Sequence, residues 1–268
     1  MPAVSFREQF RQAANLSAVE RSRYETLRQT MLELRPLFEG KTVLDYGASY
    51  GLSACALIEL GAKKVVGVEP DADRVTRGVD IIHAMGLQAK VSLATMGYEA
   101  WLPFRDKSFQ VVVANAVFEH IPQPRHAYLR EVWRVLVPSG HLIINESPNK
   151  YFPHDAHTTR LWFVPWMPSD VARRWAIFRG RIAPDQDWRT SGWRGVGYYE
   201  IVGAFDEPYR LIPETSRLRH RFLTSLGLPA SLMDPYPTWI FQKLKAPGGP
   251  DGHSRASVPC CRSPFEID

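Results

Sequence analysis

Long apolar runs are what this sequence most plainly lacks. The strongest are short, at 111–113 and 142–144, whereas a membrane-spanning helix needs about 20 consecutive apolar residues. The first residues also lack the apolar stretch of a secretory signal, because Arg7 and Arg11 interrupt it. We therefore expect no membrane span and a cytoplasmic location.

Cysteine is scarce and its positions form no useful pattern. Among the 268 residues there are 3 cysteines, with Cys55 inside an expected helix and Cys260 and Cys261 adjacent near the end. An odd set with this spacing excludes a disulfide framework and the usual zinc-ligand patterns. A reducing compartment fits such usage.

Charge of one sign is not in large excess either. The 33 basic residues outnumber the 28 acidic ones only slightly, which gives a formal charge of +5. Proteins that bind nucleic acid cluster their positive charge more strongly. We expect a mixed, solvated surface and no nucleic-acid partner, with an anionic partner as the alternative.

Strands and helices alternate along the first half of the chain. Residues 1–40 form an N-terminal helical segment, in which apolar positions at helical spacing predict a helix over 17–38. The expected strands are 42–44, 64–68, 90–94, 110–114 and 141–146, and the expected helices between them are 52–60, 71–85 and 124–136. These strands are too apolar to face solvent, so the pattern predicts an α/β domain with a parallel sheet covered on both faces.

The second half of the chain is less regular. The domain, at 41–246, contains an insertion at about 151–195 after the fifth strand, with a helix over 169–178. Strands are expected again at 209–212 and 239–244, with a helix at 216–226 between them, and the polar residues 247–268 predict a disordered tail. The aromatic residues of the insertion pack a small core or wall a ligand pocket; we expect packing for most of Phe152, Trp162, Phe163, Trp166, Trp175, Phe178, Trp188 and Trp193.

A turn with two glycines joins the first strand to the next helix. Gly47 and Gly51 let the backbone turn sharply and approach a ligand closely, and the following helix N-terminus offers unpaired N–H groups. Asp45 lies at the end of the strand, where α/β sheets bind ligands. Glu69 stands 24 residues further on, at the end of the second strand. A carboxylate there accepts hydrogen bonds from both hydroxyls of a ribose.

This loop resembles the Asp-x-Gly-x-x-x-Gly motif of class I S-adenosylmethionine-dependent methyltransferases. Glu69 resembles the acidic ribose-binding residue of that family, and the segments 102–109, 115–121 and 135–140 resemble three further motifs in the family's order. The resemblance covers residues 41–148, about two fifths of the chain. It implies a Rossmann-like fold with a mostly parallel seven-stranded sheet, and S-adenosylmethionine as cofactor.

The resemblance also implies which residues contact the cofactor. These are Asp45, Gly47, Ala48, Ser49, Gly51, Glu69, Pro70, Asn115 and Ala116. Two positions depart from the family: Ser49 stands where many relatives have glycine, and the acidic residue that is common after the third strand is replaced near Tyr98. We expect Glu99 or Trp101 to contact the adenine instead, by polar contact or by stacking. A nicotinamide-binding loop fits less well, because glycine is absent at 49 and 52.

Histidines supply the candidates for a general base. His120 follows the fourth strand, and His154, Asp155 and His157 follow the fifth, so all lie on the ligand side of the sheet. A histidine there takes the proton of an acceptor hydroxyl, and the catalytic candidates are His120, His154 and Asp155. The alternatives are a brace of the loop for His120, and recognition of acceptor hydroxyls or a metal site for the second group. We expect no metal, because these residues are bunched in one loop and no further ligand is evident.

The expected reaction is transfer of a methyl group to a small-molecule, sugar or lipid-linked acceptor, most simply to an oxygen. One alternative is a nucleic-acid methyltransferase, which the segment Asn115–Phe118 disfavours because it lacks the Asn-Pro-Pro-Tyr or Asp-Pro-Pro-Tyr sequence. A second alternative is a protein that binds S-adenosylmethionine without turnover. The partner is then a small-molecule or glycan acceptor, and the oligomeric state is open.

Overall fold

The computed structural model describes residues 5–188, 190–212, 225 and 234–245. The strands are β1 (Thr42–Tyr46), β2 (Lys64–Glu69), β3 (Val91–Thr95), β4 (Phe109–Asn115), β5 (Leu136–Asn145), β6 (Tyr209–Ile212) and β7 (Trp239–Lys243). The α-helices are α1 (Phe6–Ala14), α2 (Ala18–Phe38), α3 (Leu52–Glu59), α4 (Ala72–Ala84), α5 (His126–Arg134), α6 (Ser169–Phe178) and α7 (Tyr198–Val202), and two short 3₁₀ turns are η1 (Phe118–His120) and η2 (Val164–Trp166).

One seven-stranded sheet forms the centre of the molecule, with strand order β3-β2-β1-β4-β5-β7-β6. Strands β1 to β5 are parallel to one another, while β7 runs antiparallel to both β5 and β6. The mostly parallel seven-stranded sheet expected above is therefore confirmed.

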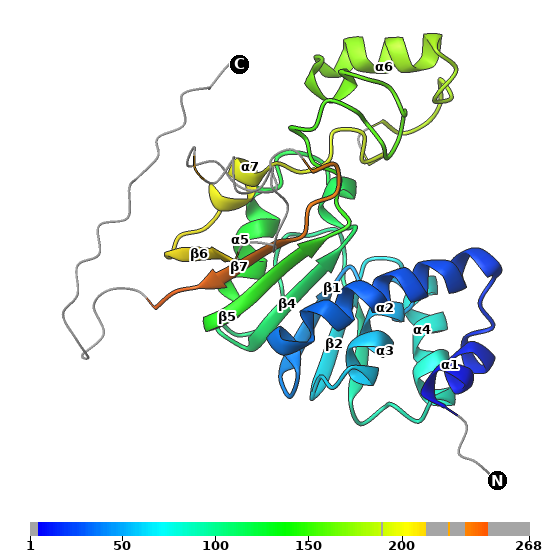
Figure 1. Cartoon of the computed structure of the whole chain (residues 1–268), viewed down its shortest axis with the longest axis vertical. Helices are drawn as coiled ribbons and strands as arrows, with labels where there is room; N and C mark the ends of the chain where they lie inside the picture. The colour runs from blue at the N-terminus through cyan, green and yellow to red at the C-terminus, as the bar shows by residue number, and fades with distance from the viewer. Residues whose placement is uncertain (1–4, 189, 213–224, 226–233, 246–268) are drawn as a thin grey trace.

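Helices cover both faces of the sheet (Figure 1). On one face, side chains of α5 and α7 pack on alternate strand residues such as Leu44 and Val112. On the other, side chains of α2, α3 and α4 pack on the intervening residues, such as Val43 and Val111. Because successive side chains of a strand point to opposite faces, the wholly apolar central strands supply both cores.

The N-terminal helices are joined to the domain by a shared core. A capping box begins α2, with Ser17 and Glu20 each bonded to the other's backbone N–H. Leu27 and Met31 of α2 belong to the same apolar cluster as the central strands. The boundary at residue 40 stays a prediction, since this packing is continuous across it.

The insertion after β5 carries α6 and η2 and stands beyond the sheet at the upper end of the view (Figure 1). Its small core includes Trp188 and Trp193, which stack with ring centroids 4.5 Å apart. The expectation that most of its aromatic residues pack a core is wrong, because five are exposed: Trp162, Phe163, Trp166, Trp175 and Phe178. The segment is too small to bury them all.

No helix among the described residues is long and apolar enough to cross a membrane. The helix expected at 216–226 and the tail expected at 247–268 lie outside the described residues, except for Ser225.

Candidate active site

The loop at residues 45–51, which we call the cofactor loop, and Glu69 lie side by side at one edge of the sheet. Strands β1 and β2 are neighbours with Tyr46 opposite Val68, so the chain leaves both strands at the same edge. The backbone N–H groups of Gly47 and Ala48 both donate to the carbonyl of Val68, at 2.9 and 3.0 Å. The two features that the resemblance pairs are therefore adjacent in space.

The loop uses its glycines where their conformational freedom is needed. Gly47 has φ 77° and Gly51 has φ 82°, a left-handed conformation that costs other residues about 1–2 kcal/mol. A Cβ on Gly47 would also lie 2.5 Å from Cγ2 of Val117. This contact brings the segment after β4 directly against the cofactor loop.

Asp45 is buried at the end of β1 and is held by the first turn of α3. The hydroxyl of Ser53 donates to its carboxyl at 2.5 Å. Burial raises the pKa of Asp45 to about 7, and this hydrogen bond opposes the rise. Asp45 therefore orders the strand-to-helix junction beneath the loop.

Glu69 fits the task of holding a nucleoside. It is only 7% exposed, and its carboxylate accepts hydrogen bonds from the backbone N–H of Ser49 at 2.9 Å and of Asp71 at 3.4 Å. Arg74 approaches to 4.0 Å. A carboxylate offers about four lone-pair sites, so Glu69 keeps acceptor capacity for ribose hydroxyls. The residues present therefore fit S-adenosylmethionine.

The remaining cofactor candidates divide into two groups. Asn115 and Ala116 lie beside the loop, but their polar groups are bonded to the end of β5: the Asn115 amide donates to Glu146, and the Ala116 N–H donates to the Asn145 carbonyl. Pro70 directly follows Glu69.

Glu99 and Trp101 form the second group. Both are exposed, Trp101 to 62%, and no described hydrogen bond connects either residue to the loop. Their contact with adenine stays a prediction, and so do the roles of the first group.

The predicted catalytic residues do not form one group. Asp155 is buried, and its carboxylate accepts hydrogen bonds from the backbone N–H groups of His157, Thr158 and Thr159 and from the Thr159 hydroxyl. Asp155 thus caps its own loop. The His154 ring lies against Trp162, with centroids 5.0 Å apart, and no described hydrogen bond joins His154 to Asp155.

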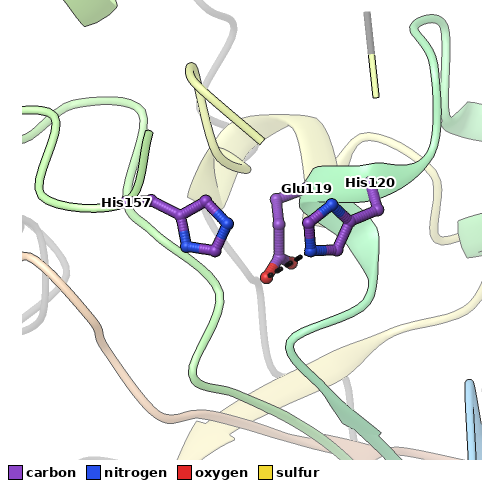
Figure 2. A group of neighbouring side chains, drawn as sticks. All are labelled: Glu119, His120 and His157. Carbon is purple, nitrogen blue, oxygen red and sulfur yellow. Dashed lines mark ion pairs between the residues drawn. The ribbon is translucent and has the colours of Figure 1, made fainter. Parts of the chain in front are cut away.

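The structure instead brings His120 together with His157 and Glu119. One ligand atom from each of the three lies within 4.8 Å of the other two, and Figure 2 shows the Glu119 carboxylate beside both imidazole rings. The ring centroids of the two histidines are 5.4 Å apart. We call Glu119, His120 and His157 the Glu-His-His cluster.

The cluster follows directly on the segment that contacts the cofactor loop. Glu119 and His120 belong to η1, immediately after the segment whose Val117 meets Gly47. The Ser147 hydroxyl, just beyond β5, donates to Oε2 of Glu119 at 2.7 Å. The cluster thus combines the regions that follow β4 and β5.

Burial shifts the pKa values of two residues of the cluster. Glu119 is fully buried, and burial raises the pKa of its carboxyl. Burial, and then the neighbouring His120, lower the pKa of His157. The side chain of His120 is 48% exposed, so solvent or a ligand reaches the cluster from that side.

The sequence pattern does not single out Glu119 as a functional residue. Its only sequence signal is a carboxylate beside a histidine after an apolar strand, which is also typical of an exposed turn. The sequence pattern groups His157 only with its loop neighbours His154 and Asp155. The contact of His157 with Glu119 and His120 joins residues far apart in the sequence, and depends on how the loops after β4 and β5 fold together.

Known proteins show the same fold over most of the chain. A protein of Pyrococcus horikoshii superposes with a TM-score of 0.54 and 18% identity, covering 85% of this chain and 92% of its own. An S-adenosylmethionine dependent methyltransferase of Mesorhizobium loti gives a TM-score of 0.50 and 16% identity, covering 81% of this chain and 98% of its own. At these identities the likeness establishes the fold alone.

Two curated sequence relatives have names that point to different acceptors. A tRNA U34 carboxymethyltransferase of Methylococcus capsulatus is 26% identical over 169 residues, which is 58% of this chain and 51% of the relative. A ubiquinone biosynthesis O-methyltransferase of Alkalilimnicola ehrlichii is 28% identical over 116 residues, 42% of this chain and 45% of the relative. The chain thus spans about half the length of these curated relatives.

The family model of the methyltransferase domain matches residues 44–144. This range begins in β1 and ends in β5, so it contains the cofactor loop, Glu69 and the Glu119–His120 pair. Fold, loop geometry and family model agree, and residues 44–144 are similar to a methyltransferase domain.

Proposed function

We propose that this protein transfers the methyl group of S-adenosylmethionine to a hydroxyl oxygen of a small-molecule or glycan acceptor. One observation carries the proposal: the loop that fits the cofactor packs at Gly47 against Val117, which directly precedes the turn that carries the exposed His120 ring. Donor and acceptor groups would then meet at a single edge of the sheet.

The cofactor side depends on binding and orientation. The bound sulfonium supplies an activated methyl group, so the protein needs chiefly to align the acceptor with it. Glu69 accepts hydrogen bonds from the ribose, and the glycine-bearing turn allows close approach of the backbone. Asp45, held by Ser53, keeps that turn in place.

The acceptor side favours oxygen because a hydroxyl must lose its proton when the methyl group is transferred. His120 presents an exposed ring beside the buried Glu119 carboxylate. An imidazole in this position binds an acceptor hydroxyl and takes its proton. Among the predicted catalytic residues, the geometry supports His120 best. The four hydrogen bonds to Asp155 support a structural role for that residue.

A two-part experiment tests the proposed function. Calorimetry with S-adenosylmethionine measures cofactor binding, and the formation of S-adenosylhomocysteine is then followed over a panel of hydroxylated small molecules and glycans, with amines and tRNA as comparison. We expect binding, and turnover only with hydroxylated acceptors. Turnover with tRNA alone would replace the acceptor class, and binding without any turnover would indicate a protein that no longer catalyses transfer.

A further inference from the structure

We propose that the Glu-His-His cluster binds one divalent transition-metal ion. Two imidazoles and one carboxylate are a donor set that suits zinc, manganese, iron or nickel. Binding of the ion is independent of methyl transfer; its use in holding the acceptor hydroxyl rests on the proposed function above.

The positions of the ligand atoms suit a single ion. Nitrogen and oxygen ligands lie about 2.0–2.2 Å from such ions, so two ligands of one ion are at most about 4.4 Å apart. The three candidate atoms lie within 4.8 Å of one another. The widest pair exceeds this limit by about 0.4 Å, a shift that small side-chain rotations provide.

An unpartnered oxygen points independently to a ligand. Glu119 is fully buried, and its Oε1 has no hydrogen-bond partner among the described residues. Its other oxygen is held by Ser147, and Arg125 donates to the Glu119 backbone carbonyl rather than to the carboxylate. A buried carboxylate oxygen without a partner is costly, and a cation bound there would remove that cost.

The surroundings also orient the histidines as ligands. Nδ1 of His120 lies 2.9 Å from the carbonyl of Thr190, an acceptor that requires the proton on Nδ1. The lone pair of Nε2 then faces Glu119, 3.9 Å from its Oε1. Metal-binding histidines characteristically donate their second nitrogen to a carbonyl or carboxylate, which fixes the tautomer.

Gly192 closes the other side of the cluster. A Cβ at this position would lie 2.8 Å from Cδ2 of His157 and 3.2 Å from Cγ of Glu119. The insertion therefore packs its backbone directly on two of the three ligands. His120, by contrast, is half exposed, so the site is open on that side.

Three protein ligands and an open side leave coordination positions for an exchangeable ligand. A hydroxyl bound there becomes more acidic, because the cation stabilises the oxyanion. In the reaction, the bond between oxygen and the methyl carbon forms as the carbon–sulfur bond breaks. With Nε2 of His120 bound to the ion, the ion takes over from His120 the task of easing deprotonation, and the hydroxyl proton goes to solvent. The ion changes neither its charge nor its oxidation state.

The binding test uses the full chain after treatment with a chelator, titrated with Co²⁺ and followed by visible absorption, with Zn²⁺ calorimetry in parallel. We expect one equivalent of each ion to bind. Glu119→Gln, His120→Ala and His157→Ala should each weaken binding at least about tenfold, the usual range for the loss of a contact worth 1.4 kcal/mol or more. The matched control is His154→Ala, from the same loop as His157, which should keep the wild-type affinity.

Several outcomes would overturn the site: no cobalt absorption, unchanged affinity in all three cluster variants, or equal loss in the control. Thermal melts of the metal-free variants identify any that fail to fold; Glu119→Gln keeps an oxygen for Ser147 and is the variant best suited to fold. Metal binding without turnover would contradict the proposed function alone. Full turnover in a chelated protein that binds no Co²⁺ would contradict the metal site alone.

Discussion

At the scale of single residues, Glu69 has a structural role and a proposed role in binding, which a substitution can separate. It accepts hydrogen bonds from Ser49 and Asp71, which shapes the loop, and it has lone pairs for a ribose. Glu69→Ala should weaken S-adenosylmethionine binding by about 1–3 kcal/mol, because charged hydrogen bonds to the ligand are lost. Calorimetric titration gives the affinity.

Glu69→Gln is the matched control for this prediction. It keeps one oxygen to accept from the Ser49 backbone but removes the charge, so it should melt like the wild type and bind with intermediate affinity. If the cofactor affinity is unchanged in both variants, Glu69 does not contact the ribose.

Asp45 predicts a dependence of stability on pH. Its pKa is raised from 3.8 to about 7 in the folded protein, so the folded state holds a proton that the unfolded chain releases. The contribution of Asp45 to the free energy of unfolding should therefore fall as pH rises from about 4 to about 7, and stay level above that. In Asp45→Asn this fall should disappear, and above pH 7 the variant should be more stable by on the order of 4 kcal/mol.

Urea unfolding of both proteins at a series of pH values measures this difference. Ser53→Ala serves as the second comparison, because it removes the hydrogen bond that opposes the rise in the pKa of Asp45. Its fall in stability should extend to higher pH. Parallel pH curves for the wild type and Asp45→Asn would show that Asp45 is charged in the folded protein throughout this range.

At the scale of elements, Arg125 connects the two segments that build the Glu-His-His cluster. Arg125 directly precedes α5 and is buried. Its guanidinium donates to the carbonyls of Glu119, Ile121 and Gly195. It also forms an ion pair with Glu200 of α7 at 3.3 Å. Arg125→Ala should lower the free energy of unfolding by about 3–5 kcal/mol, as expected for one partner removed from a buried pair.

The same substitution should disturb His120 more than the cofactor loop. We expect Arg125→Ala, where it folds, to lose Co²⁺ affinity while S-adenosylmethionine affinity changes less than about threefold, a difference below 1 kcal/mol. Arg130→Ala, an exposed arginine of α5, is the control and should affect neither. Equal losses of both affinities would mean that Arg125 stabilises the whole sheet edge rather than this connection.

The spacing of apolar residues predicted most helices and strands, because each of them buries either one face or all of its side chains. The expected helix at 169–178 has the bounds of α6, and the expected strand at 209–212 has those of β6. The fifth strand differs: it begins at Leu136 rather than at residue 141, because its first residues pair with β4 across an irregularity in register between Phe109 and Val111. Such pairing is a property of two strands, so the pattern of one strand does not reveal it.

At the scale of the whole molecule, the mild positive charge predicts weak binding of polyanionic acceptors such as tRNA. One relative is named as acting on tRNA, whereas the formal charge of this chain is only +5. We expect the protein to leave heparin at low salt, and tRNA binding, measured as a function of salt, to show a slope shallower than about −2, which corresponds to about two phosphate contacts. A slope of −5 or steeper would favour a nucleic-acid acceptor.

The sequence by itself determined the α/β sheet, its cofactor loop and the carboxylate at the end of the second strand. These features are local: each depends on a few consecutive residues whose spacing and backbone freedom suit one conformation. Tertiary structure alone decided that Asp155 caps its loop and that His157, rather than His154, joins His120 and Glu119. That choice depends on how two loops after different strands pack across the sheet edge, and no spacing along one segment encodes such a contact.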